Sequence, residues 1–213
     1  MSYDSRAGWV VVIPVKPSAL AKSRLAVLGP QRRMALAQAF ALDTVTALAA
    51  TTSVRAVLVV TRDHDARETF GRFSKVEVLV DRRSGMNEAI QQGAIWAIRY
   101  APTAAVAVLP ADLPAATPEL VEVFLARASA HARGVLGDME MIGTTALTAL
   151  PGISIEPAFG PGSLQAHLRS GAVLVDGAGL EPLRRDVDIV EHLEAALLLG
   201  VGRATRQVVA AEA

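Results

Sequence analysis

The sequence predicts an α/β fold with a Rossmann-like, mostly parallel sheet and helices on both faces. Through the first 130 residues, apolar strand-like runs alternate with segments whose apolar residues recur at helical spacing, which is the pattern of a doubly wound sheet. The first run, residues 9–15, is continuous and rich in valine, as strands buried on both faces are. The chain has 213 residues, of which 52% are hydrophobic, and this supports one sizeable core. We therefore expect a single domain over residues 1–213, with residues 1–8 and 208–213 frayed.

The expected elements follow one another along the chain. The clearest start signal is Thr117 followed by Pro118 and Glu119, because Thr at the N-cap and Pro in the first turn both favour helix initiation. After residue 131 the alternation loosens. The expected strands are 9–15, 54–61, 76–80, 104–109, 134–136, 144–150 and 172–175, and the expected helices are 31–50, 63–73, 87–100, 117–130, 162–170 and 189–199.

Composition excludes several classes of protein. The 21 basic and 21 acidic residues balance, so no global charge favours nucleic acid or an anionic membrane. The chain has no cysteine, which rules out disulfides, thiolate metal sites and a cysteine nucleophile. The first eight residues are polar and too short for a signal peptide, and no apolar run is long enough to span a membrane. We expect a cytoplasmic protein that binds neither nucleic acid nor membrane.

A cluster of cations follows the first expected strand. Lys16, Lys22 and Arg24 come after Pro14 on a stretch without an acidic residue. Ligands of open α/β sheets bind outside the carboxyl ends of the strands, and Lys and Arg are good donors to phosphate. The stretch matches neither GxxxxGK[ST] nor GxGxxG, so side chains more than backbone amides would hold the phosphates. A solvated basic loop is the alternative.

Three aspartates suit a divalent cation. Asp112 lies between two prolines directly after the strand 104–109, while Asp186 and Asp188 lie in an extended segment where alternate residues point the same way. Mg²⁺ prefers one or two carboxylates together with phosphate oxygens. The alternatives are that Asp112 caps a turn and that Asp188 caps the last expected helix.

Two glycine-containing loops indicate a second anionic ligand. Gly143 precedes Thr144 and Thr145, and the sequence FGPGS ends at Ser163, where a helix is expected to begin. Hydroxyl groups and the free amides of a helix N-terminus favour anions. Ordinary turn chemistry is the alternative for either loop.

Three further polar residues have less definite roles. Asn87 stands at the expected start of a helix, where it would act as the N-cap or contact a base or ribose. His167 falls within the helix after FGPGS, and a lone histidine is more often structural than functional. Asp138 follows a strand and would join either the metal or the second ligand.

Together these segments resemble a known family. The stretches IPVKPSALAKSRL, GMNEAI, LPADLP, IGTT, FGPGS with His167, and RRDVDIVEHL occur in the same order in the 2-phospho-L-lactate / phosphoenolpyruvate guanylyltransferase family (CofC/FbiD type). The resemblance covers about residues 9–204. It implies a nucleotide-diphospho-sugar transferase-like fold and one nucleotidyltransferase domain. It also implies transfer of GMP from GTP to a phosphorylated three-carbon acid, with release of pyrophosphate, in the biosynthesis of coenzyme F(420).

The acceptor implied first is phosphoenolpyruvate, which would give enolpyruvoyl-2-diphospho-5'-guanosine; 2-phospho-L-lactate and 3-phosphoglycerate are alternatives. The family reads close to GTGT where this chain has Met141-Ile-Gly-Thr-Thr145, so either threonine matches the family's second one. The roles implied by the resemblance are nucleotide binding by Pro14, Lys16, Lys22, Arg24 and Asn87, catalysis by Lys22, Arg24 and Asp112, Mg²⁺ binding by Asp112, Asp186 and Asp188, and acceptor binding by Thr144, Thr145, Gly160 and Ser163.

The implied chemistry is an in-line attack by a phosphate oxygen of the acceptor on the α-phosphorus of GTP. Because that oxygen is already anionic, no general base is required. The product would pass to the next enzyme of the pathway, and a homodimer is left open. Two alternative hypotheses remain. The first is another nucleotidyltransferase of this fold, which would normally carry an opening loop close to GGxSxRMG. The second is a non-catalytic nucleotide-binding regulator.

Overall fold

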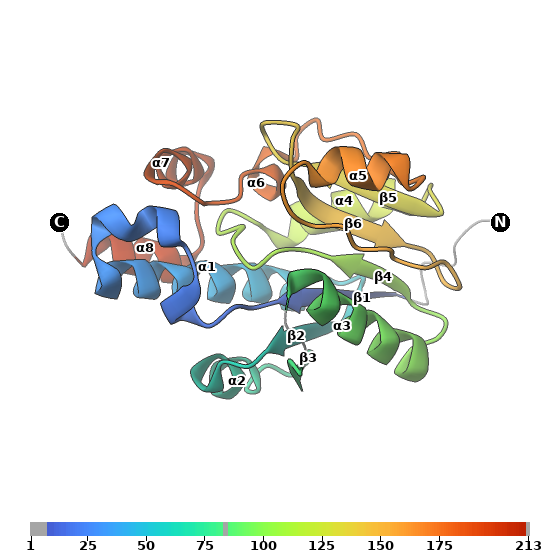
Figure 1. Cartoon of the computed structure of the whole chain (residues 1–213), viewed down its shortest axis with the longest axis horizontal. Helices are drawn as coiled ribbons and strands as arrows, with labels where there is room; N and C mark the ends of the chain where they lie inside the picture. Colours follow the sequence, from blue (N-terminus) through green and yellow to red (C-terminus); the bar gives the residue numbers. More distant parts are fainter. Residues whose placement is uncertain (1–7, 83–84, 212–213) are drawn as a thin grey trace.

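The computed structural model describes residues 8–82 and 85–211, and a seven-stranded sheet forms its central layer. The strands are β1 Trp9–Pro14, β2 Val54–Thr61, β3 Val76–Val80, β4 Ala105–Val108, β5 Arg133–Gly137, β6 Thr144–Ala149 and β7 Val173–Leu174. Their order across the sheet is β3-β2-β1-β4-β6-β5-β7. The first four strands are parallel to one another, β6 runs antiparallel to β4 and β5, and β7 is parallel to β5. The mostly parallel α/β sheet predicted from the sequence is confirmed (Figure 1).

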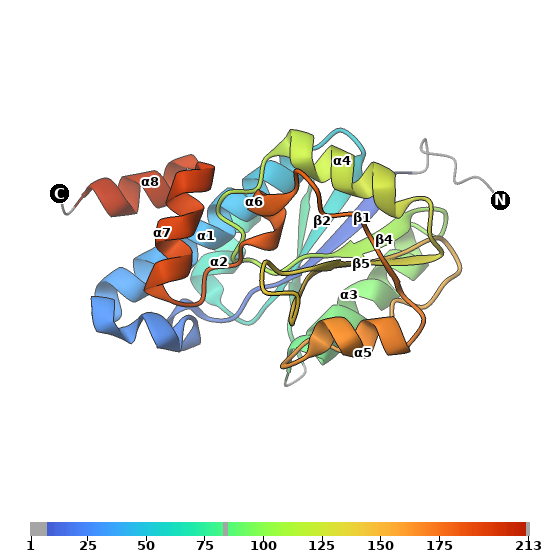
Figure 2. The same ribbon diagram turned by 90° about the horizontal axis from the view of Figure 1, so that it is seen from above.

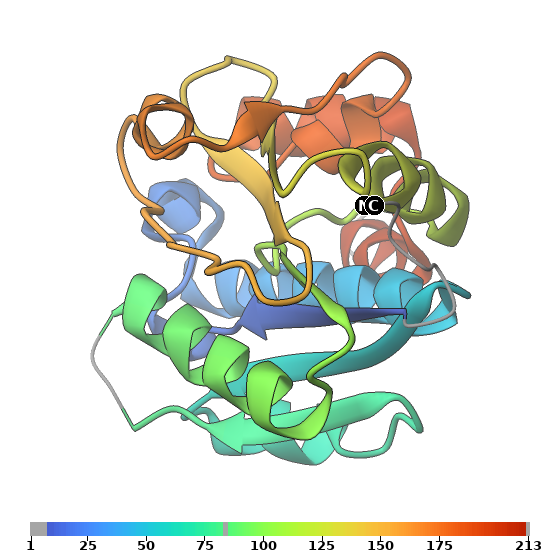
Figure 3. The ribbon, with the colours of Figure 1, turned by 90° about the vertical axis from the view of Figure 1, so that its right-hand side faces the viewer.

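Helices cover both faces of this sheet. The α-helices are α1 Pro30–Ala50, α2 His64–Phe70, α3 Met86–Tyr100, α4 Pro118–Ala128, α5 Ser163–Arg169, α6 Glu181–Arg184, α7 Val190–Leu199 and α8 Arg203–Ala210, and the 3₁₀ helices are η2 Ser18–Leu20 and η3 Ser23–Leu28. Viewed from above, α1 and α4 lie on one side of the sheet and α3 and α5 on the other (Figure 2). Figure 3 shows the same separation from the end of the molecule. All six expected helices are present, and α6, α8 and the two 3₁₀ helices are additional.

The valine-rich β1 is buried on both faces, as its composition predicts. Val11 and Ile13 pack into the hydrophobic cluster beneath α1 and α4, whereas Val10 and Val12 pack into the cluster beneath α3. The contact with α3 is close, because a Cβ added at Gly93 would lie 2.5 Å from a methyl group of Val12. The strand from which the first cationic loop departs is therefore fixed from both sides.

A third hydrophobic cluster lies between α1, α7 and α8, beyond the edge of the sheet at which β1 ends (Figure 1). It joins Leu36 and Phe40 of α1 to Leu193 of α7, and Val208 and Val209 of α8 pack against it. Residues 208–210, which the sequence was expected to leave frayed, are thus the end of a packed helix. Gly8 and Ala211, also expected to fray, are held by backbone hydrogen bonds to Ala105 and Gln207. The remaining expected frayed residues, 1–7 and 212–213, lie outside the described residues.

The start of α8 is held by a side chain from α1. The carboxylate of Asp43 accepts hydrogen bonds from the amides of Ala204 (2.9 Å) and Thr205 (2.8 Å). Gly202 leaves room for that carboxylate, because a Cβ there would lie 2.3 Å from the Asp43 carboxyl carbon. The helix lacks a cap in its own sequence, and Asp43 satisfies two of its free amides instead.

We expect Asp43→Ala to lower the free energy of unfolding by about 1–2 kcal/mol, the usual loss when a helix cap is removed. Urea unfolding measures this loss, and hydrogen exchange should show faster opening at Ala204 and Thr205. Asp43→Asn is the control, because it keeps one acceptor oxygen and should lose less. Equal stability of Asp43→Ala and the unsubstituted protein would contradict a capping role.

No helix among the described residues combines the length and apolarity that crossing a membrane demands.

Candidate active site

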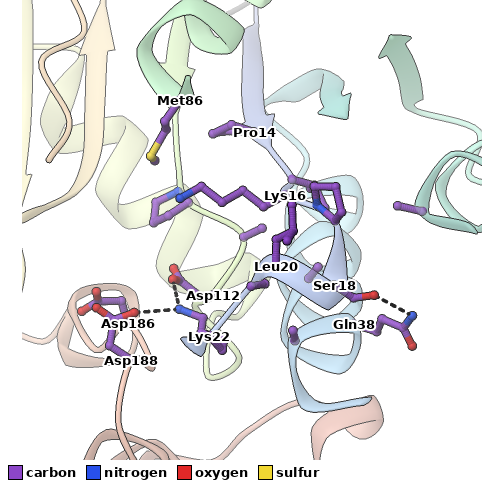
Figure 4. A pocket seen from close by; sticks show the side chains of 18 of the residues that line it. Pro14, Lys16, Ser18, Leu20, Lys22, Gln38, Met86, Asp112, Asp186 and Asp188 are labelled. Atoms are coloured by element: carbon purple, nitrogen blue, oxygen red, sulfur yellow. Dashed lines mark hydrogen bonds and ion pairs between the residues drawn. The ribbon is translucent and has the colours of Figure 1, made fainter. Parts of the chain in front are cut away.

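The predicted site residues gather at one edge of the sheet. Pro14 ends β1 there and Asp112 follows β4, while Thr144 begins β6, whose reversed direction brings its start to the same edge. A cleft of about 1350 Å³ opens at this edge. The predicted residues that line it are Pro14, Lys16, Lys22, Arg24, Asp112, Thr144, Gly160, Ser163, Asp186 and Asp188. Figure 4 shows the part of the cleft around Lys22.

The segment between α6 and α7 is pinned beside the loop after β4. The amide of Val187 donates to the carbonyl oxygen of Asp112 (3.1 Å), and the Val187 side chain is buried in the third cluster. Arg184 donates to the carbonyl oxygen of Asp138 (2.9 Å), which ties the same segment to the end of β5. With Val187 turned inward, the alternation of an extended chain directs Asp186 and Asp188 into the cleft.

Asp112, Asp186 and Asp188 form a cluster that suits a divalent cation. One oxygen from each carboxylate lies within 4.8 Å of the others. Burial, followed by the charges of Asp112 and Asp188, raises the pKa of Asp186 to about 7. Oδ1 of Asp112 is buried and has no hydrogen-bond partner among the described residues. An unsatisfied carboxylate oxygen in a group of crowded acids is a ligand set that a hard cation would complete.

Asp188 does not cap α7, contrary to one alternative from the sequence. The residue at the N-cap position of α7 is Ile189, and Asp188 instead faces the cations of the first loop. A second acidic group, formed by Asp138, Glu140 and Asp186, suits a metal less well. Both oxygens of Asp138 already accept backbone amides, and Glu140 pairs with an arginine.

Lys22 is paired, although no acid stands near it in the sequence. Its ammonium group donates to Asp112 and to Asp188, the latter at 3.0 Å. Burial would lower the pKa of Lys22, but the charges of Asp112 and Asp188 outweigh it and raise the pKa above its usual value. Lys22 also holds down the pKa of Asp188, against the effect of burial, with a smaller contribution from Arg24. Lys22 is therefore a fixed positive charge and a poor nucleophile.

The other two cations of the loop are available to a ligand. Arg24 is 73% exposed in its side chain and approaches Asp188 only to 3.7 Å. Lys16 is exposed and forms no ion pair within the described part of the chain. Its side chain extends across the cleft toward the side where Met86 lies (Figure 4).

A bulge in β6 distinguishes the two threonines. Leu136 of β5 pairs with Ala146, but its neighbour Gly137 pairs with Thr144, so Thr145 is the extra residue. Such bulges re-aim side chains near sites. Thr144 lines the cleft, whereas Thr145 is 1% exposed, and its hydroxyl has no partner among the described residues. The geometry favours Thr144 as the threonine that meets a ligand in the cleft.

Asn87 is not the N-cap of α3, contrary to the prediction from the sequence. The N-cap residue of α3 is Gly85, the helix begins at Met86, and these two residues line the cleft. The side-chain amide of Asn87 instead pairs with the backbone of Phe159 in both directions, at 2.8 and 3.0 Å. Asn87 thus holds the FGPGS loop, and the sequence offered no signal for this partner 72 residues away.

His167 is fully buried and bonded at both ring nitrogens. Nδ1 lies 3.0 Å from the Thr144 hydroxyl oxygen, and Nε2 accepts the amide of Ala158 at 2.9 Å. Burial, with a smaller contribution from the charge of Arg133, lowers the pKa of His167 to about 4. The imidazole is therefore neutral near pH 7.

Comparison with known families settles where the chain belongs. The sequence profile of the family described as "Guanylyl transferase CofC like" matches residues 9–172. The chain belongs to this family. Two relatives named phosphoenolpyruvate guanylyltransferase are similar over almost their whole length. The one from Streptomyces scabiei is 44% identical and covers 92% of this chain and 94% of its own. The one from Streptosporangium roseum is 39% identical and covers 98% of this chain and 94% of its own.

The fold of this family member is that of the nucleotide-diphospho-sugar transferases. A protein from Desulfovibrio desulfuricans G20, provisionally assigned as such a transferase, superposes with a TM-score of 0.61 at 15% identity, covering 94% of this chain and 97% of its own. A 4-diphosphocytidyl-2C-methyl-D-erythritol synthase superposes with a TM-score of 0.62 at 15% identity, covering 90% and 98%. The fold expected from the sequence resemblance is confirmed.

As the pH is lowered from 6.5 to about 4, we expect the free energy of unfolding to fall more steeply for the unsubstituted protein than for His167→Asn. Between pH 6.5 and about 4 an unfolded histidine binds a proton that the folded His167 does not, so acidification in this range favours the unfolded state. Urea unfolding at several pH values measures the difference. His131→Asn is the matched control and should keep the steeper profile. Parallel profiles for His167→Asn and the unsubstituted protein would refute the assignment.

Without nucleotide, we expect Lys22→Met to bind Mn²⁺ or Mg²⁺ roughly tenfold more tightly than the unsubstituted protein, equivalent to about 1.4 kcal/mol. The ammonium group of Lys22 is bonded to Asp112 and Asp188 and would compete with a cation for both carboxylates. Calorimetry and Mn²⁺ paramagnetic resonance measure the affinity without any turnover. Lys16→Met removes a lysine that pairs with neither aspartate and should change the affinity by less than about twofold. Unchanged or weaker binding by Lys22→Met would contradict the competition.

Proposed function

We propose that this protein transfers GMP from GTP to phosphoenolpyruvate, giving enolpyruvoyl-2-diphospho-5'-guanosine and pyrophosphate. The observation that carries the proposal is one cleft that combines three loop cations, three clustered carboxylates and two hydroxyl-bearing loops. Membership of the guanylyl transferase family and the names of the relatives support the same reaction.

The triphosphate of GTP would lie against the first loop. Lys16 and Arg24 have exposed charges beside the end of β1, at Pro14, and would bind phosphate oxygens. Lys22 faces the same cleft with a positive charge that its environment stabilises. The guanosine would lie toward the start of α3. Asn87, which the resemblance assigned to the nucleotide, would act indirectly, because its side chain holds the loop at Phe159 that leads into Gly160 and Ser163 on the acceptor side.

Asp112, Asp186 and Asp188 would hold Mg²⁺, and the buried oxygen of Asp112 without a partner supports this role. When bound, the ion would neutralise charge on the phosphates and help align them. The remaining neutralisation falls to Lys16, Lys22 and Arg24, because two polyanions repel each other strongly as they approach.

The acceptor would bind between Thr144 and the loop at Gly160 and Ser163, which line the cleft. A phosphate oxygen of the acceptor attacks the α-phosphorus of GTP and forms the new P–O bond. The bond to the β-phosphate oxygen breaks, and pyrophosphate leaves with the electron pair. The attacking oxygen is an anion, so no proton has to be removed. The residues contribute orientation and charge.

We place this reaction in the biosynthesis of coenzyme F(420) in the cytoplasm, with the product passing to the next enzyme of that pathway. The competing acceptors, 2-phospho-L-lactate and 3-phosphoglycerate, differ from phosphoenolpyruvate by a few atoms and belong in the same assay.

The test is release of pyrophosphate from GTP and Mg²⁺ with each acceptor in parallel, coupled to the next pathway enzyme. We expect release with phosphoenolpyruvate and a loss of at least about 100-fold for Asp112→Asn, because one removed charge-stabilising group typically costs that much. Asp176→Asn, whose side chain is 74% exposed, is the control and should keep full activity.

GTP binding without pyrophosphate release from any acceptor would favour the regulator reading instead. Release with another acceptor alone would keep the transfer and correct the substrate.

A further inference from the structure

His167 connects both loops that line the acceptor side of the cleft. It projects from α5, is 0% exposed, and reaches Thr144 at the start of β6 with Nδ1 and Ala158 with Nε2. The ring also packs edge-on against Phe159, with 5.1 Å between ring centres. One side chain therefore fixes the threonine loop relative to the segment that leads into Gly160.

The direction of these hydrogen bonds can be assigned. The amide of Ala158 can only donate, so Nε2 must accept and carries no hydrogen. In a neutral imidazole the hydrogen is then on Nδ1, which donates to the hydroxyl oxygen of Thr144. The hydroxyl hydrogen of Thr144 is not used by His167.

That hydrogen has no acceptor among the described residues, and Thr144 lines the cleft. With its oxygen already accepting a bond from His167, the hydroxyl is set to donate into the cleft. A donor suits a phosphate or carboxylate oxygen, and the bond to an anion is stronger than a neutral one. The bond that the Thr144 hydroxyl oxygen accepts from Nδ1 polarises the hydroxyl group, which strengthens the hydrogen bond that this group donates.

The second hydrogen bond of His167, from the Ala158 amide to Nε2, supports the segment that leads into Gly160. Ala158 and Phe159 are held by His167 on one side and by Asn87 of α3 on the other. The next residues are Gly160, with φ of 142°, and the turn into Ser163. If Nε2 lost its acceptor function, this turn would lose one of its two lateral supports.

We propose that His167 is a positioning residue for the acceptor: it donates through Nδ1 to Thr144, so that the threonine hydroxyl points its hydrogen at an anionic oxygen of the acceptor. The proposal rests on the proposed function. His167 does not touch the reacting atoms, and its effect is on acceptor binding rather than on the nucleotide.

Two variants separate the hydrogen bond that His167 donates to Thr144 from the hydrogen bond that it accepts from Ala158. In His167→Asn the amide nitrogen replaces Nδ1 and keeps the donor to Thr144. In His167→Gln the amide oxygen replaces Nε2 and keeps the acceptor for Ala158 but loses the donor. We expect the acceptor KM to rise about tenfold or more for His167→Gln and by less than about threefold for His167→Asn, with the GTP KM nearly unchanged in both. Thr144→Val should match His167→Gln, and the double variant should add little.

A purely structural histidine would give another pattern. Equal rises of the KM for GTP and for phosphoenolpyruvate would overturn the proposal. A larger rise of the phosphoenolpyruvate KM in His167→Asn than in His167→Gln would overturn it as well. An acceptor KM unchanged in every variant would do the same while leaving the transfer activity established. If the unsubstituted protein neither turns over nor binds phosphoenolpyruvate by calorimetry, the proposed function fails first. Should a His167 variant not fold, Thr144→Val against Thr144→Ser tests the same hydroxyl.

Discussion

The site depends on a balance of charge at one edge of the sheet. Asp112, Asp186 and Asp188 are close enough to repel one another, and burial makes that repulsion more costly, as the raised pKa of Asp186 shows. Lys22 offsets it from a loop that is distant in the sequence. The same attraction keeps Lys22 protonated. Clustered carboxylates that suit a cation and a lysine held in its protonated form together favour chemistry by charge neutralisation over covalent catalysis.

The rest of the fold holds this cluster and the facing wall in place. The bond from Val187 to the Asp112 backbone joins the two aspartate segments, and the third hydrophobic cluster anchors them to α1 and α7. On the opposite wall, Asn87 and His167 clamp the loop at Phe159 from two helices. In the proposed function, the nucleotide would lie against the parallel half of the sheet and the acceptor against the half that contains the reversed strand β6.

Features fixed by nearby residues could be predicted from the sequence, and features fixed by distant partners could not. The alternation of strands and helices, the N-cap at Thr117 and the shared direction of Asp186 and Asp188 all follow from local periodicity. By contrast, α8 is capped by Asp43 from 161 residues away, and Lys22 pairs with carboxylates 90 and 166 residues away. The bulge that separates Thr144 from Thr145 depends on pairing with β5 and leaves no mark in the threonine loop itself.

The central claim is that the cleft aligns two anions for one direct displacement and forms no bond with the nucleotide itself. The stereochemical course at the α-phosphorus tests this most directly. The substrate would be a single diastereomer of GTP in which sulfur replaces one non-bridging oxygen of the α-phosphate. After turnover with phosphoenolpyruvate, phosphorus NMR would give the configuration of the product. The account predicts inversion, because one in-line attack inverts the centre. Retention would contradict it, since two successive displacements through an enzyme-bound guanylyl group, on Lys22 or any other residue, would be required.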